Sequence, residues 1–153
     1  MRPGEVSALN VEDITRKPSG ILINVRRSKT DQAAGGQLVG VARRDNPQTD
    51  PIRALDDWLR VRPSEPGALY TRIFWRNHLT VERIGHRAIN RRCRSARAIT
   101  AGLDGIPVSG HSLRAGHATT AAVNGASIDR IAAQTRHRDS VHWLATTSAQ
   151  LRR

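Results

Sequence analysis

The chain has 153 residues, a length that suits one folded domain, and its formal net charge is +12 because 25 Lys and Arg face 13 Asp and Glu. Such a surface attracts nucleic acid by displacing condensed counterions, although an Arg-rich composition that serves only solubility is the alternative interpretation. The sequence has no apolar run of about 18 residues, no apolar segment behind its N-terminus, and one cysteine, Cys93. We therefore expect a soluble, cytoplasmic protein with no membrane contact and no disulfide framework.

The first third of the chain predicts a short helix followed by a β-hairpin. Residues 3–9 have Pro at the first helical position and apolar residues that can pack on one side. The β-branched run at 21–25 is expected to pair antiparallel with residues 38–41 across a glycine-containing loop. Lys29 would then lie near the turn of this hairpin.

Helical spacing returns in the middle of the chain. Apolar residues at helical intervals between 52 and 59 predict a helix with Asp50 as its N-cap. Residues 68–70 predict a short extended piece. A long Arg-rich helix is expected from Val81 to about Ala98, because apolar residues recur there at intervals that form a stripe.

Two further helices are predicted near the end of the chain. Residues 111–123 form the first, which Asn124 and Gly125 would stop, and residues 128–136 form the second, with Ser127 as its cap. A weak helix is expected from 141 to 151. Together these segments predict one α+β domain over residues 1–153, mainly α-helical with a small antiparallel hairpin sheet.

The four residues His111-Ser112-Leu113-Arg114 suggest a phosphate site. Metal-free transfer of a phosphodiester needs guanidinium groups on the nonbridging oxygens, a proton donor for the leaving oxygen, and an in-line nucleophile. A spacing of three puts His111 and Arg114 on one helical face, with Leu113 expected to turn inward. In isolation this pattern is weak, and a surface His and Arg at a helix start would explain it as well.

The surrounding sequence resembles the tyrosine recombinase (phage integrase) family. Members carry an R-x-x-E-hydrophobic-x-x-L segment, a Lys in a β-hairpin turn, an H-x-L-R box, a second His about 23 residues later, and then a Tyr. The chain matches four of these features in order: Arg2 to Leu9 reads RPGEVSAL, Lys29 lies in the predicted hairpin, His111 to Arg114 reads HSLR, and His137 follows. The resemblance implies an incomplete DNA breaking-rejoining catalytic core.

That resemblance also implies roles for the matched side chains. Arg2 and Arg114 would clamp the scissile phosphate, Glu5 would support Arg2 through a charge-assisted hydrogen bond, and Lys29 would protonate the leaving oxygen. Two histidines complete the pattern. His111 would act in acid–base chemistry or hydrogen-bond the phosphate, and His137 would bind the phosphate. No cofactor is implied.

The sequence departs from the family pattern at both ends. Thr146 stands where the nucleophilic tyrosine is expected, and the one tyrosine, Tyr70, lies upstream of the H-x-L-R box. A Thr hydroxyl is a poor substitute because no base is evident to activate it. Since Met1 directly precedes Arg2, we expect the family's N-terminal core-binding domain to be absent and the gene to be degenerate. Catalytic inactivity is the expectation.

Two functional hypotheses remain open at this point. One is site-specific DNA recombination through a 3′-phosphotyrosyl intermediate; the other is a remnant that only binds double-stranded DNA. A histidine–metal protein is disfavoured, because neither His111 with His117 nor His137 with His142 has the spacing of helical ligands. Homo-oligomers on DNA are a further expectation. Five arginines are candidate DNA-backbone contacts, weighed evenly against a solvated helix face: Arg83, Arg87, Arg91, Arg94 and Arg97.

Overall fold

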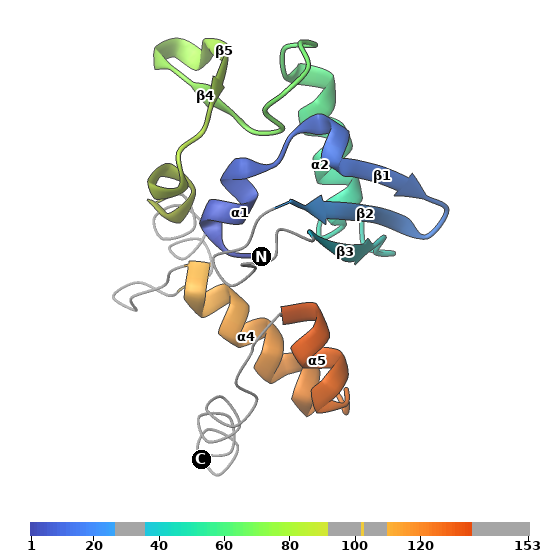
Figure 1. Ribbon diagram of the computed structural model, residues 1–153. Helices are drawn as coiled ribbons and strands as arrows, with labels where there is room; N and C mark the ends of the chain where they lie inside the picture. The colour runs from blue at the N-terminus through green and yellow to red at the C-terminus, as the bar shows by residue number, and fades with distance from the viewer. Residues whose placement is uncertain (27–35, 92–101, 103–109, 136–153) are drawn as a thin grey trace. The chain divides into compact units, whose positions relative to one another are not determined.

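The computed structural model describes residues 1–26, 36–91, 102 and 110–135 (Figure 1). Two compact units divide the chain: Pro3–Ile89 forms one, and Asn90–Arg153 together with Met1–Arg2 forms the other. Helices and small antiparallel sheets make up the described residues, so the predicted α+β class is confirmed. None of the helices in the described ranges is both long and apolar enough to cross a membrane.

A three-stranded antiparallel sheet is the centre of the first unit (Figure 1). Strands β2 (Gly20–Val25) and β3 (Gln37–Ala42) pair with Ile23 opposite Val39, which confirms the predicted hairpin. The prediction lacked the third strand, β1 (Ile14–Lys17), which pairs with β2 through a tight turn that joins Lys17 to Gly20. This strand is largely exposed and polar, so it has no apolar run to reveal it.

The core of this unit lies between the sheet and α2 (Pro51–Val61). Alternate β2 residues are buried because side chains along a strand point to opposite faces, and Ile52 and Leu55 of α2 are buried as well. The predicted Asp50 N-cap is confirmed, since its carboxylate accepts hydrogen bonds from the backbone N–H groups of Ile52 and Arg53. Among the described residues of this unit, eight apolar side chains are buried: Leu9, Ile21, Ile23, Val25, Val39, Ile52, Leu55 and Leu69.

The predicted long helix from Val81 to Ala98 is wrong at its start. Strand β5 (Leu79–Arg83) pairs antiparallel with β4 (Thr71–Ile73). Of the described residues within the predicted range, only 86–91 are helical. The β-branched residues Thr80 and Val81 favour a strand, and pairing with β4 overrides the helical spacing. The extended piece expected at 68–70 is a single bridge between Ala68 and Asn10.

Two short helices precede the sheet: α1 (Pro3–Ala8), close to the prediction, and the 3-10 helix η1 (Val11–Asp13). A further 3-10 turn, η2 (Trp75–Asn77), joins β4 to β5.

The second unit contains two packed helices, α4 (Gly110–Val123) and α5 (Ile128–Thr135), which lie side by side (Figure 1). Both were predicted. Gly125 has a φ of 78°, and Ala126 N–H bonds to the Ala121 carbonyl, so the α4 C-terminus closes in the expected glycine-dependent way. The Ser127 Oγ accepts the Arg130 N–H at 3.4 Å, as a cap does. The weak helix predicted at 141–151 lies outside the described residues.

Candidate nucleic-acid interface

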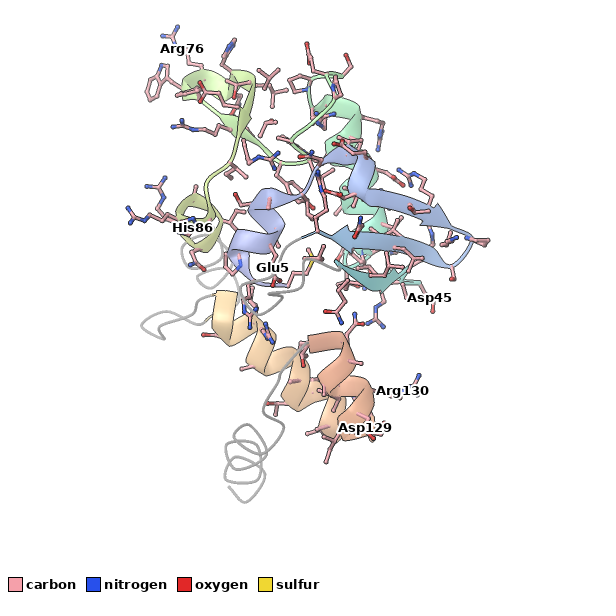
Figure 2. All side chains as sticks on the ribbon, viewed as in Figure 1. Glu5, Asp45, Arg76, His86, Asp129 and Arg130 are labelled. Carbon is pink, nitrogen blue, oxygen red and sulfur yellow. The ribbon has the colours of Figure 1, made fainter. Side chains whose placement is uncertain are left out.

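The segment that matches the family's first motif begins at Arg2 and continues into α1. Arg2 is half-buried, and Glu5 is only 6% exposed. Figure 2 shows Glu5 on α1. A carboxylate at this depth requires polar or cationic neighbours, since burial disfavours its charged form. Arg2 and Arg114 belong to the same compact unit, and Glu5 belongs to the other.

Arg83 binds the C-terminal end of α1. Its Nη1 donates to the carbonyl oxygens of Ser7 at 2.7 Å and Leu9 at 2.8 Å, and its Nη2 donates to the Asn10 side chain. The Ser7 hydroxyl in turn donates to the Ile84 carbonyl at 2.6 Å. A cation on the last carbonyls of a helix both satisfies orphan acceptors and complements the helix dipole. Strand β5 therefore fixes the helix that follows Arg2.

The base of the predicted Lys29 hairpin is also fixed, although Lys29 itself lies outside the described residues. Arg26, the residue after β2, donates to the buried Asp13 carboxylate at 2.7 Å. This hydrogen bond raises the pKa of the Arg26 guanidinium, so the group stays charged. Asp13 also accepts the Asn10 N–H at 2.8 Å, which joins the hairpin base to the start of η1.

A pocket of about 460 Å³ opens beside this ion pair. Its wall combines polar groups with a few apolar side chains: Glu5, Asp13, Asn24, Arg26, Leu9 and Val25. Across from Arg26, Gly36 has a φ of 64°, a conformation that L side chains rarely adopt. The pocket thus lies where the family motif of α1 and the base of the Lys29 hairpin come together.

Helix α4 carries the H-x-L-R box, with His111 in its first turn and Arg114 one turn later. Arg114 is 9% exposed, whereas Leu113 is 56% exposed, so the expectation that Leu113 turns inward is wrong. The buried Ala118 lies four residues after Arg114, and residues four apart share a helical face. The inward stripe of α4 therefore includes the arginine, and the leucine lies about 100° away from it.

The Tyr70 side chain packs against Trp58. Its ring stacks on Trp58 with 6.4 Å between centroids, and the Trp58 Nε1 donates to the Leu69 carbonyl at 2.7 Å. Burial raises the pKa of the Tyr70 phenol. A phenol with a raised pKa is a weaker nucleophile at neutral pH, because less of it is ionised. The expectation that Tyr70 is not a nucleophile stays a prediction.

The candidate backbone-contact arginines have different surroundings. Arg87 and Arg91 are exposed on the helical residues 86–91, while Arg83 lies on β5 against α1. Four predicted positions fall outside the described residues, as does Thr146: Lys29, Arg94, Arg97 and His137.

The sequence interpretation missed the Arg26–Asp13 pair. Asn10 and Asp13 are three residues apart at the start of η1, the spacing of a capping box, and this local signal could have identified Asp13. Nothing in the sequence indicates that Arg26 is its partner, since the two are 13 residues apart and meet only through the sheet.

Comparison with known proteins identifies a relative in sequence and related solved structures. No protein-family model matches the chain. An integrase/recombinase XerD homolog of Selenomonas ruminantium is 29% identical over 137 residues, which is 90% of this chain and 40% of that protein. The crystal structure of XerA recombinase matches with a TM-score of 0.69 and 24% identity, over 95% of this chain and 46% of XerA.

The chain spans less than half the length of either protein. Its fold is that of part of a tyrosine recombinase core, and the sequence relative is an integrase/recombinase. In fold and in sequence the chain is therefore similar to part of a tyrosine recombinase.

Proposed function

We propose that this domain binds double-stranded DNA around one backbone phosphate and does not cut it. The observation that carries the proposal is the burial of Arg114 on α4, inside the H-x-L-R box of a recombinase fold. A guanidinium held near the protein interior is preorganised for bidentate binding of phosphate oxygens. The proposed phosphate ligands are Arg2, Lys29, His111, Arg114 and His137, with Glu5 supporting Arg2.

Binding without cleavage is favoured by the surroundings of Tyr70. Strand cleavage requires a nucleophile in line with the phosphorus, and Tyr70 is instead stacked on Trp58, where burial raises the pKa of its phenol. Thr146 lacks an activating base in the sequence. Recombination through a 3′-phosphotyrosyl intermediate is the second candidate, favoured by the similarity to an integrase/recombinase.

The exposed arginines extend the proposed contact along the DNA backbone. Arg87 and Arg91 are the described candidates, and Arg94 and Arg97 continue the same run. We assign Arg83 to the fixation of α1 instead, since its guanidinium already donates to Ser7 and Leu9. The proposal includes assembly of several copies on DNA and a location with the nucleoid in the cytoplasm.

Fluorescence anisotropy with a labelled duplex tests the proposal. The logarithm of the association constant should fall linearly with the logarithm of salt concentration, by about 0.9 per phosphate contacted. Arg114→Gln should weaken binding by about tenfold or more, since a hydrogen bond to a charged group contributes about 1.5–3 kcal/mol. Arg130→Gln is the matched control, because Arg130 projects from α5 in the same unit (Figure 2) and carries the same charge.

Arg114→Lys tests whether weaker binding comes from the lost guanidinium and not from misfolding, because it keeps the positive charge but loses the planar fork. It should bind between the wild-type protein and Arg114→Gln, with an unchanged circular-dichroism spectrum. A salt-independent affinity, or equal losses in Arg114→Gln and Arg130→Gln, would remove the phosphate site.

A nicked duplex that traps covalent intermediates separates the two candidate functions. We expect no protein–DNA adduct in a denaturing gel after incubation with this substrate. An adduct that survives denaturation would instead establish cleavage, and mass spectrometry of the adduct would identify the attacking side chain.

A further inference from the structure

The hairpin between β4 and β5 ends in a strained turn. Arg76 (φ 56°, ψ 35°) and Asn77 (φ 61°) both occupy the left-handed region, which is unfavourable for residues with a Cβ. The turn is closed by hydrogen bonds from Phe74 N–H to the His78 carbonyl at 2.8 Å and from His78 N–H to the Trp75 carbonyl at 3.4 Å. Two successive positive φ angles define the primed hairpin turn, whose first central position prefers Asn, Asp or Gly over Arg.

The side chains of this turn are exposed. Trp75 is 83% exposed and Phe74 is 46% exposed. Figure 2 shows Arg76 at the tip of the hairpin, pointing away from the strands. Arg76 at a left-handed position does not favour stability, since Asn or Gly is preferred there.

The other arginines of the hairpin are already engaged. Arg72 pairs with Glu82 at 3.0 Å and lies 4.8 Å from the centre of the Phe74 ring, and Arg83 binds the end of α1. Within the described part of the chain, Arg76 has no hydrogen bond or ion pair through its side chain. The turn from Trp75 to His78 contains no acid, and Glu82 is neutralised by Arg72.

We propose that this turn, residues 75–78, is a second DNA contact, in which Arg76 binds a backbone phosphate and the Trp75 ring covers the adjoining sugar. The occupant follows from charge: the turn presents a cation without an acid, in a chain of net charge +12, beside a large aromatic surface. The proposal rests on the DNA binding proposed above, but it uses none of the phosphate ligands named there.

A substitution that relieves the backbone strain at Arg76 and also removes its guanidinium should raise thermal stability and lower duplex affinity. Arg76→Asn places a residue that tolerates the left-handed region at the first central position of the turn. The thermal midpoint should rise by a few degrees. Duplex affinity should fall about eightfold at 0.1 M salt, and the salt slope should decrease by about one, as expected when one phosphate contact is lost.

Three further variants make the measurement specific. Arg76→Lys keeps both the charge and the strain, so its midpoint and salt slope should match those of the wild-type protein. Arg53→Gln removes the same charge from an exposed position on α2 and should leave duplex affinity within twofold. Trp75→Ser should weaken binding severalfold while leaving the salt slope unchanged, since the indole carries no charge.

The outcomes separate this proposal from the function on which it rests. Wild-type duplex binding that Arg76→Asn leaves unaltered would overturn the second contact alone. An absence of duplex binding by the wild-type protein would overturn both. A change in sedimentation coefficient for Trp75→Ser at constant duplex affinity would instead assign the turn to contact between protein copies.

Discussion

Replacement of Arg83 by alanine should destabilise the fold without acting on DNA directly. The substitution removes two hydrogen bonds of 2.7 and 2.8 Å from a charged donor to the carbonyls of Ser7 and Leu9. Such bonds contribute about 1.5–3 kcal/mol each when buried, but Arg83 is exposed, so we expect about 2 kcal/mol for the pair. With a urea dependence of about 2 kcal/mol per molar, the unfolding midpoint should fall by about 1 M.

Urea titration followed by circular dichroism measures this effect, with Arg87→Ala as the matched control. Arg87 lies four residues further along, is exposed, and should change stability by less than about 0.5 kcal/mol. Arg83→Lys should be intermediate, because a single ammonium group replaces the planar fork. Equal midpoints for Arg83→Ala and Arg87→Ala would refute the reasoning, and unchanged stability with weakened duplex binding would return Arg83 to the DNA-contact set.

Three other substitutions test the packing that supports the site. Leu69 is 1% exposed, so Leu69→Ala should lower the free energy of unfolding by about 3 kcal/mol in urea titration; a loss below about 1 kcal/mol would contradict that burial. Gly20→Ala should cost at least about 2 kcal/mol in the same assay, because its Cβ would lie 2.1 Å from the Val41 carbonyl oxygen, and a wild-type midpoint would contradict the strand register. Burial alone would raise the pKa of Asp50, but backbone N–H donors, including that of Ile52, hold it below its ordinary value. A lowered pKa stabilises the fold above about pH 4 and is lost as pH falls through it, so the gap in thermal midpoint between wild type and Asp50→Asn should close from about pH 5 to about pH 2.

Elements that local signals define could be predicted from the sequence. The β2–β3 hairpin follows from β-branched residues around a glycine-containing loop, and α2 follows from the Asp50 cap. Helices α4 and α5 follow from Ser127, Gly125 and helical spacing. Each of these signals acts within a few residues, where propensity and capping have their effect.

Features that depend on distant partners could not be predicted. The strand β5 pairs with β4, and that pairing outweighs the helical spacing of the arginines. Arg83 was predicted either to contact DNA or to lie on a solvated helix face, because the backbone carbonyls that it binds leave no trace in the sequence. The prediction that Leu113 turns inward was wrong because hydropathy alone favours a leucine as the buried residue, whereas the structure buries Arg114.

The bonds between α1 and the end of β5 also govern when the first helix can settle during synthesis. Arg83 follows Ser7 by 76 residues, so a ribosome adding about 5–20 residues each second completes the partner roughly 4–15 seconds later. A six-residue helix is too short to persist alone in water. The nascent α1 segment therefore lacks its stabilising partner until the β4–β5 hairpin has emerged.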